Sequence, residues 1–252
     1  MPSPRISCAQ YQASLRTWYA TPSGRVLQGA LQAHLDRFVP RLFGYHALQI
    51  GHTDPEHDLL TASRIHNRMQ LACEPGQGHI TALAEALPVL SDSMDLVLLN
   101  HCLESSPDPC LVLRETERIL VPEGHVLIIG FNPFSPTGLW RMLPRRPGGK
   151  TQAGHVYSTA RVGDWLTLLG FEVLACAYAG FYPRNENRPS GGRRPVVECL
   201  GGRHLPYLGG AYVILARKRV ANMMPLSARW RSSGKMAPGR LASPFCRRTD
   251  RD

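Results

Sequence analysis

The sequence lacks the long apolar run of a membrane protein. Its longest stretch of this kind, residues 126–129 with their flanks, falls far below the roughly 18 residues that indicate a membrane-spanning helix. The first ten residues contain no apolar core of a secretory signal peptide. We therefore expect a soluble, cytoplasmic protein without a membrane partner.

The sequence also lacks any Cys-x-x-Cys pair, although it contains seven cysteines. They are scattered along the chain, at Cys8, Cys73, Cys102, Cys110, Cys176, Cys199 and Cys246. An odd number of dispersed cysteines is typical of free thiols in a reducing compartment, and excludes a disulfide framework. No pair of histidines has metal-ligand spacing, so no metal site is expected.

The body of the chain has little net charge, although the whole sequence carries +10. From Arg217 to the C-terminus there are ten Lys and Arg against two Asp, which leaves only +2 for residues 1–216. Residues 220–252 show little periodicity and are predicted to be a disordered basic tail. Such a tail is usually only solvated; the alternative is contact with nucleic acid or an acidic partner.

At 252 residues the chain has the length of one α/β domain with decorations. Residues 1–46 are expected to hold an irregular segment, over 1–20, and then one helix. In that helix apolar side chains recur every three or four positions, and Thr21 or Ser23 caps its start, while Pro40 disturbs its last turn. The apolar positions are Leu27, Leu31, Leu35, Phe38 and Leu42.

Residues 47–219 are predicted to alternate between strands and helices. Short apolar runs predict buried strands at 47–51, 95–100 and 126–130, with further strands at 69–73, 79–83, 171–177 and 212–216. Helices are predicted at 55–66, from an Asp108 cap onward, and at 158–169 before Gly170. Strands that are apolar on both faces and separated by helices indicate an α/β fold with a mostly parallel sheet covered by helices.

One connection conflicts with this pattern. Parallel neighbours need a crossover of about a dozen residues, and residues 74–78 cannot supply one between the strands at 69–73 and 79–83. Either the helix between these strands has been lost, or one of the two strand predictions is wrong.

Four segments occur in an order that is similar to a known family. They are Ala-Leu-Pro-Val-Leu-Ser-Asp-Ser-Met-Asp-Leu-Val at 86–97, Asn-His-Cys-Leu-Glu at 100–104 with Pro-Asp-Pro at 107–109, residues 114–124 ending in Pro-Glu-Gly, and Gly-Phe-Glu-Val at 170–173. Together they resemble the type 11 branch of class I S-adenosylmethionine (SAM)-dependent methyltransferases over roughly residues 47–216. The resemblance implies a Rossmann-like, doubly wound sheet with helices on both faces, reduced around strands two and three. It also implies SAM as cofactor and an unknown methyl acceptor.

The resemblance further implies where the cofactor would bind. In the family an acid-x-Gly-x-Gly-x-Gly loop follows the first strand, and here Gln49, Gly51, Thr53 and Pro55 match it, so one glycine of three remains and the acid is an amide. An amide oxygen still accepts a hydrogen bond from an ammonium group. Alone, Gly51 is more typical of an ordinary strand-to-helix turn, and only the match of the later segments makes close approach to a ligand equally plausible. Residues implied to lie around the methionine end are Gln49, Gly51, His52 and Thr53.

Other positions follow from the same resemblance. Glu74 is the candidate for the ribose hydroxyls, and Ala84 with Glu85 lies near the adenine, where Leu83 replaces the family's Asp. Asn100 and His101 would lie beneath the reacting centre, at the carboxyl end of a central strand where open α/β sheets bind ligands.

No catalytic residue is fixed by the sequence. The candidates are His101, Asn132, which follows strand five in a long Pro/Gly-rich loop, and Tyr157, which precedes a helix. Glu104 is interpreted as a solvated carboxylate at a helix start. The sequence therefore predicts a SAM-dependent methyltransferase of unknown substrate. The alternative is a catalytically inactive relative that acts as a binding or scaffolding protein.

Overall fold

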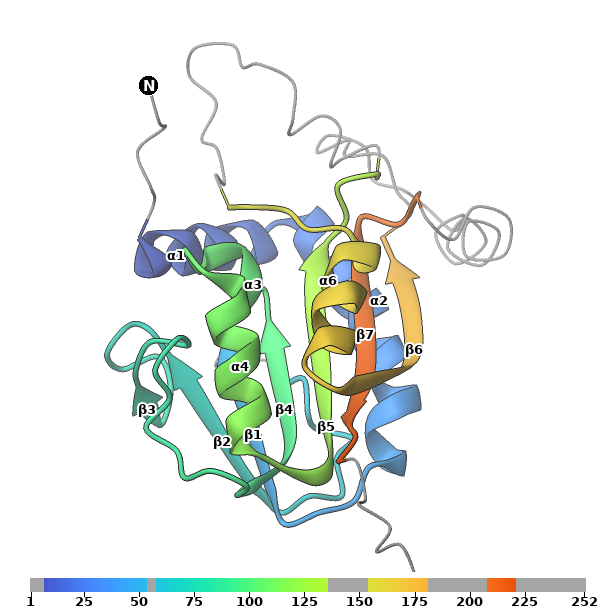
Figure 1. Ribbon diagram of the computed structural model, residues 1–252. Helices are drawn as coiled ribbons and strands as arrows, with labels where there is room; N and C mark the ends of the chain where they lie inside the picture. The colour runs from blue at the N-terminus through green and yellow to red at the C-terminus, as the bar shows by residue number, and fades with distance from the viewer. Residues whose placement is uncertain (1–6, 54–57, 136–153, 181–207, 221–252) are drawn as a thin grey trace, which may run out of the picture. The chain divides into compact units, whose positions relative to one another are not determined.

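The described residues form one mixed sheet with helices on both faces. The computed structural model describes residues 7–53, 58–135, 154–180 and 208–220 (Figure 1). Within them the strand order is β3-β2-β1-β4-β5-β7-β6. Strands β1 to β5 pair in parallel, and β7 runs antiparallel to both neighbours, β5 and β6. The strands are β1 His46–Gly51, β2 Asn67–Ala72, β3 Ile80–Thr81, β4 Met94–Asn100, β5 Leu120–Phe131, β6 Phe171–Ala179 and β7 Ala211–Lys218.

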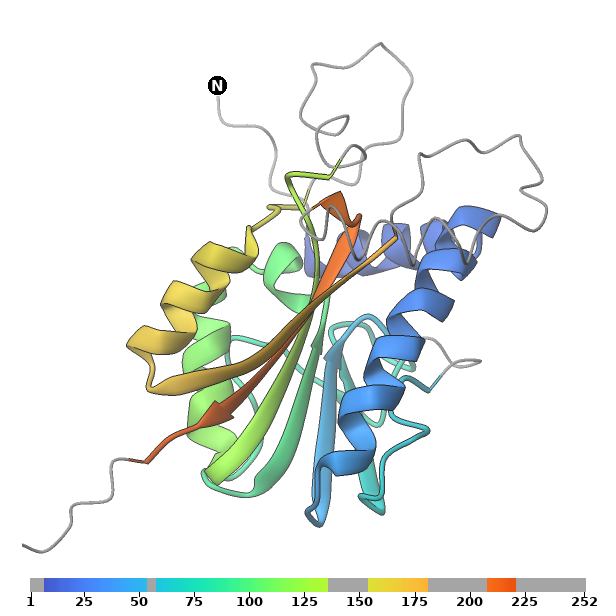
Figure 2. The same cartoon turned by 90° about the vertical axis from the view of Figure 1, so that its right-hand side faces the viewer.

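The helices divide between the two faces of this sheet (Figure 2). Alternate side chains of a strand point to opposite faces, so Leu48 packs in the core cluster under α4 and α6, whereas Ala47 packs in the cluster under α2. The arrangement confirms the predicted Rossmann-like, mostly parallel fold. The helices are α1 Cys8–Tyr19, α2 Pro22–Phe38, η1 Val39–Arg41, α3 Cys102–Ser105, α4 Pro109–Ile119 and α6 Thr159–Leu168.

Most predicted helix ends are confirmed by their caps. Thr21 Oγ1 accepts a hydrogen bond from the Gly24 amide at 3.2 Å, which starts α2. Asp108 accepts from the amides of Cys110 and Leu111 and so starts α4. Gly170, with φ of +80°, ends α6 as a left-handed glycine.

The prediction of an irregular N-terminal segment is wrong over Cys8–Tyr19, which is helix α1. Ser7 and Gln10 form a reciprocal capping box at 3.3 Å that starts this helix. Its buried stripe contains Tyr11, Leu15 and Tyr19, spaced by four residues. Two of these three are tyrosines, so the periodicity of aliphatic residues alone does not reveal the stripe.

The helix predicted at 55–66 is absent from the part that the structure describes, residues 58–66, where the chain makes turns. Short polar side chains bind the backbone there: Asp58 accepts from the Leu60 amide at 2.9 Å and Ser63 from the Ile65 amide at 3.1 Å. Such bonds compete with helical hydrogen bonds. Residues 54–57, with Pro55, lie outside the described residues.

Strands β2 and β3 are both present and parallel, with Leu71 opposite Ile80 and Ala72 opposite Thr81. Residues 73–79 join them without a helix. Of the two alternatives left by the sequence, the lost helix is therefore correct. A two-residue strand needs only a short return, so the minimum crossover length for longer parallel strands does not apply to it.

The basic C-terminal cluster begins later than the sequence suggested. Arg217 and Lys218 belong to β7, and both pair with acidic groups: Arg217 with Glu172 at 2.9 Å, and Lys218 with Asp92 at 3.1 Å. The tail at 221–252 lies outside the described residues, as do the basic residues of the loop at 136–153. Within the described parts, no helix combines the length and apolarity needed to cross a membrane.

Candidate functional site

The candidate site is at the carboxyl ends of β1 and β4, where Gly51 lies opposite Asn100. Gly51 has φ of +102°, and a Cβ atom there would come within 2.4 Å of the Asn100 carbonyl oxygen. The His52 amide donates to that same oxygen at 2.9 Å. Glycine is thus required for the tight junction of the two strand ends.

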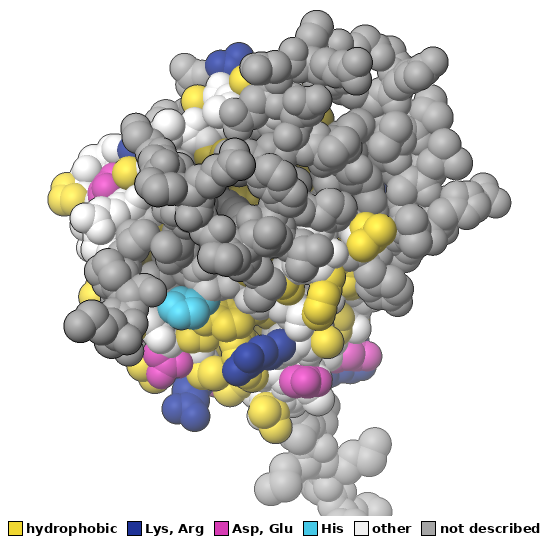
Figure 3. Space-filling model, turned by 90° about the horizontal axis from the view of Figure 1, so that it is seen from above, with side chains coloured by type: hydrophobic (Ala, Val, Ile, Leu, Met, Phe, Trp, Pro, Cys, Tyr) yellow, Lys and Arg dark blue, Asp and Glu magenta, His cyan; other side chains and the backbone are white. Residues whose placement is uncertain are grey.

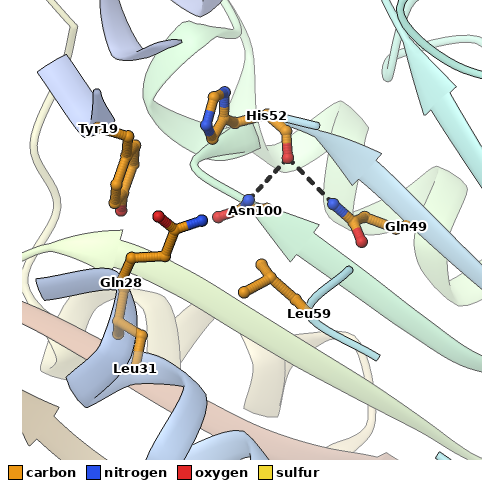
Figure 4. A pocket seen from close by; sticks show the side chains of 7 residues that line it. All are labelled: Tyr19, Gln28, Leu31, Gln49, His52, Leu59 and Asn100. Atoms are coloured by element: carbon orange, nitrogen blue, oxygen red, sulfur yellow. Dashed lines mark hydrogen bonds between the residues drawn. The ribbon is translucent and has the colours of Figure 1, made fainter. Parts of the chain in front are cut away.

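Two side-chain amides converge on one carbonyl group at this junction. Gln49 Nε2 donates to the His52 carbonyl oxygen at 3.1 Å, and Asn100 Nδ2 donates to it at 2.7 Å (Figure 4). A carbonyl only accepts, so these bonds fix which end of each amide is nitrogen. The two amide oxygens remain as acceptors. Gln49 is 1% exposed, and within the described residues its Oε1 has no hydrogen-bond partner.

These amides lie in a pocket with an empty volume of about 280 Å³, which we call the amide pocket. No charged side chain lines it among the described residues. In Figure 4 the side chains of α2 approach it from one side and those of β1 and β4 from the other. Its lining residues are Tyr19, Gln28, Leu31, Gln49, His52, Leu59 and Asn100.

A second pocket, the α1 pocket, has an empty volume of about 180 Å³ and shares the loop after β1. Arg16 of α1 reaches Glu74 at 3.3 Å, and Thr53 Oγ1 donates to the Gln77 carbonyl at 2.8 Å. Gln12 is 4% exposed, and neither of its amide atoms has a partner in the described part of the chain. The α1 pocket is lined by Gln12, Arg16, Gly51, Thr53, Ala72, Cys73, Glu74 and Gln77.

Beside the amide pocket, a buried carboxylate is linked to a tyrosine through a histidine. Glu104 Oε2 accepts from His101 Nδ1 at 3.1 Å, and His101 Nε2 contacts the Tyr19 hydroxyl at 2.6 Å. The Tyr11 hydroxyl and the Phe131 amide also donate to this carboxylate. We call the first three residues the Glu104–His101–Tyr19 chain.

Glu104 is 3% exposed, so its interpretation as a solvated carboxylate is wrong. Burial by itself raises the pKa of a carboxyl group, but the charge of His101 and the hydrogen bonds from His101, Tyr11 and Phe131 outweigh it. The pKa of Glu104 is therefore held below its ordinary value of 4.5. The group is an anion at neutral pH.

The structure brings together most of the residues that were predicted to bind the cofactor. Gln49, His52 and Asn100 line the amide pocket, while Gly51, Thr53 and Glu74 line the α1 pocket. The predicted adenine pair lies elsewhere, because neither residue lines either pocket. Ala84 is buried in the apolar core, and Glu85 accepts from the Ser106 hydroxyl at 2.5 Å.

The three catalytic candidates have different environments. His101 is fully buried but contacts the pocket-lining Tyr19. The Asn132 side chain makes two hydrogen bonds within the protein: it donates to the Gly209 carbonyl at 2.9 Å and accepts from the Phe134 amide at 3.1 Å. Tyr157 packs edge-on against Trp165, and burial raises its pKa. Neither Asn132 nor Tyr157 lines the amide pocket or the α1 pocket. Seen from the strand-end side, hydrophobic and histidine side chains reach the surface beside the undescribed residues (Figure 3).

Sequence reasoning missed the contributions of α1 and α2 to the site. Gln12 and Arg16 of α1, Tyr19 at its end, and Gln28 of α2 all line a pocket. The detectable signal was the spacing of Tyr11, Leu15 and Tyr19, which predicts a helix and points both tyrosines to one side.

The strand order with its antiparallel β7, and polar pockets at the ends of β1 and β4, define the class of protein. The chain belongs to the class I SAM-dependent methyltransferase superfamily. A family model described as "Methyltransferase domain" matches residues 36–128. The chain is also 31% identical over 202 residues to the uncharacterized protein YafS of Escherichia coli K12, covering 80% of each chain.

Solved structures agree on the fold. A SAM-dependent methyltransferase from Thermotoga maritima is similar with a TM-score of 0.61 and 16% identity, over 83% of this chain and 97% of that one. The [4+2]-cyclase SpnF is similar with a TM-score of 0.56 and 14% identity, over 87% of this chain and 100% of that one. At such identities the likeness concerns the fold alone.

Proposed function

We propose that this protein binds SAM at the ends of β1, β2 and β4 and transfers its methyl group to an acceptor. The observation that carries the proposal is the buried Oε1 of Gln49, which has no hydrogen-bond partner among the described residues. A buried polar atom without a partner costs about 1–3 kcal/mol. A ligand with an N–H group in the amide pocket would supply the missing donor.

The chemistry of the amide pocket fits the amino-acid end of SAM. An ammonium group carries three donors and no acceptor. The amide nitrogens of Gln49 and Asn100 are used by the His52 carbonyl, so each residue presents its oxygen as an acceptor, and acceptors are what an ammonium needs. The ammonium would be held by Gln49 Oε1 and by the oxygen of Asn100.

The α1 pocket fits the nucleoside end. Glu74, at the end of β2, is a carboxylate suited to a pair of ribose hydroxyls, and Gln12 offers both a donor and an acceptor. Glu74 is held by Arg16 in a half-exposed ion pair, which contributes at most about 1 kcal/mol and is easily exchanged for a ligand.

Bound SAM supplies a methyl group activated by the positive sulfur. The chain's residues would hold the nucleoside and amino-acid ends in place and keep water from the reacting centre, since in-line methyl transfer depends mainly on alignment. A base is needed only for a protonated acceptor.

One observation favours the alternative of a non-catalytic relative. Both pockets are almost filled by their own side chains, with room for about one water molecule or none, whereas typical ligand sites have roughly 300–1,000 Å³. The fold also serves reactions besides methyl transfer, as the cyclase SpnF illustrates. Under the methyltransferase proposal, α1 must move to enlarge the α1 pocket when the cofactor binds.

Thermal unfolding with and without S-adenosylhomocysteine (SAH), the demethylated product, separates the two functions. We expect SAH to raise the melting temperature of the full-length protein, because a ligand that binds only the folded state stabilises it. The shift should shrink in Gln49→Leu. Equal melting temperatures with and without SAH would favour the non-catalytic relative.

A further inference from the structure

The α1 pocket contains a buried side-chain amide that has no hydrogen-bond partner. Gln12 is 4% exposed, and among the described residues neither its Nε2 nor its Oε1 makes a hydrogen bond. An unpaired donor and an unpaired acceptor in the interior both cost free energy. A water molecule does not remove this cost, because the closed pocket has no room for one. The two atoms therefore suit a ligand that offers a donor and an acceptor side by side when the pocket opens.

We propose that Gln12 binds the base of the nucleoside and selects adenine through its 6-amino group. The amino group would donate to Gln12 Oε1, and Gln12 Nε2 would donate to the neighbouring ring nitrogen. The inference rests on the proposed function, because it concerns the nucleoside end of the same site. It makes Gln12 a specificity-determining residue, on a helix that the sequence analysis did not predict.

The fold places Gln12 next to the residue proposed for the ribose. Helix α1 lies across the carboxyl ends of the parallel strands (Figures 1 and 2). Gln12 and Arg16 are one turn apart and so share a face of this helix. Arg16 reaches Glu74 at 3.3 Å, and Gln12 and Glu74 line the same pocket. A base bound by Gln12 and a ribose bound by Glu74 can therefore belong to one nucleoside.

The two side chains differ in the groups that they can bind. A carboxylate only accepts, so Glu74 suits the hydroxyl donors of a ribose. A carboxamide has a donor beside an acceptor, which matches the amino group and the adjacent ring nitrogen of adenine, and glutamine pairs with adenine in this way in protein–DNA complexes. The pocket wall also includes the small residues Gly51, Ala72 and Cys73, which suit the flat face of a base.

The positions that the family resemblance implied for adenine do not offer this chemistry. Leu83 is apolar and 58% exposed, and Ala84 is buried in the apolar core. Glu85 accepts from the Ser106 hydroxyl at 2.5 Å. None of the three implied residues lines either pocket. Among the described residues of the α1 pocket, Gln12 has the buried side-chain acceptor that lacks a donor.

The experiment compares two probes by calorimetry on the full-length protein. One is SAH, and the other is the SAH analogue in which purine replaces adenine, so that only the 6-amino group is absent. We expect the wild type to bind the analogue about five- to hundredfold more weakly, because the buried Oε1 of Gln12 is then left without a donor. Gln12→Leu removes the whole amide, so this variant should bind the two probes with equal affinity.

The matched control is Gln28→Leu. It makes the same exchange in α2, at a residue that lines the amide pocket and not the α1 pocket. Whatever its effect on SAH affinity, it should keep the wild-type ratio of the two dissociation constants. A purely structural role of Gln12 would change both affinities together and leave this ratio as it is. Gln12→Met, which also lacks the amide, answers the same question if Gln12→Leu does not fold.

The outcomes separate this inference from the proposed function. If the wild type does not bind SAH, the proposed function fails and this inference with it. If SAH binds but the wild type does not distinguish the two probes, or the Gln12 variants keep its preference, the proposed function stands and the role of Gln12 is refuted. Loss of the preference in Gln28→Leu would also refute it, because the preference would then not depend on Gln12 in particular.

Discussion

At the scale of single residues, Gly51 and Glu104 are the positions that the site tolerates changing least. Gly51 has a backbone conformation that L-residues rarely adopt, and the carbonyl of Asn100 occupies the place of a Cβ. Glu104 is a buried anion, and it is stable because three donors, one of them His101, surround it. Both residues keep the ends of β1 and β4 in the geometry that forms the amide pocket.

Gly51→Ala should lower the free energy of unfolding by at least about 1–3 kcal/mol, the cost of one strained backbone position. The matched control is Gly29→Ala in α2, where a Cβ meets no atom within 4 Å. Alanine is favoured over glycine inside a helix, so this change should stabilise by about 0.5–1 kcal/mol. Urea unfolding of both variants checks the prediction, and equal stabilities would show that Gly51 is not required for the strand junction.

The stability of the protein should fall in acid partly through Glu104. Its pKa is lowered in the folded state, so its contribution is complete above the ordinary value of 4.5 and is lost as the pH falls through the lowered value. Glu104→Gln should be less stable at neutral pH and lose less stability between pH 5 and 3. Unfolding free energies measured along this range test it; parallel curves for the two proteins would contradict it.

At the scale of elements, α1 is the part that decides access to the pockets. Its Arg16 and Gln12 cover the α1 pocket, while Tyr19 closes one side of the amide pocket. The contact with Glu74 is a half-exposed ion pair, and such pairs contribute little to stability. The ion pair therefore adds little to the cost of moving α1, whereas the buried Tyr11, Leu15 and Tyr19 hold this helix on the sheet.

Arg16→Ala should keep the fold and tighten SAH binding by up to about fivefold, because at most about 1 kcal/mol of closing contact is removed and Glu74 is released. Arg68→Ala is the matched control, since Arg68 pairs with Asp58 at 2.8 Å with similar exposure and lines neither pocket. Calorimetry on the two variants makes the comparison. Weaker binding in Arg16→Ala would show that Arg16 holds the ligand instead of closing the pocket.

Some elements of the fold could be predicted from the sequence, and others could not. Strands β1, β4 and β5 are continuous apolar runs, and the caps at Thr21 and Asp108 are local signals, so these parts were predictable. The path of residues 58–66 depends on a few hydrogen bonds from polar side chains to the backbone, which a periodicity argument does not detect. The Glu104–His101–Tyr19 chain joins residues 82 positions apart and becomes visible only once α1 is placed.

At the scale of the whole molecule, the described residues form a mostly parallel sheet that contains no helix in the described parts of the connections from β1 to β2 and from β2 to β3. The charge of the chain is uneven as well. Residues 221–252 carry seven Lys and Arg against two Asp, or +5 of the total of +10. The remaining +5 belongs to residues 1–220, where Arg217 and Lys218 are already paired with acids.

If the basic tail binds nucleic acid, the affinity must depend steeply on salt, because binding releases counterions. Removing residues 221–252 should then abolish binding to a random DNA duplex at low salt while SAH binding persists. Fluorescence anisotropy at several salt concentrations measures this. DNA affinity retained by the shortened protein would assign the contact to the body of the chain.

We propose above all that polar groups at the ends of β1 and β4 form the binding site for the amino-acid end of SAM. Calorimetric titration of the full-length protein with SAH tests it most directly. We expect saturable binding of one SAH molecule per chain, and weaker binding in Gln49→Leu. No detectable heat at millimolar SAH would contradict it and leave the methyltransferase fold without its cofactor.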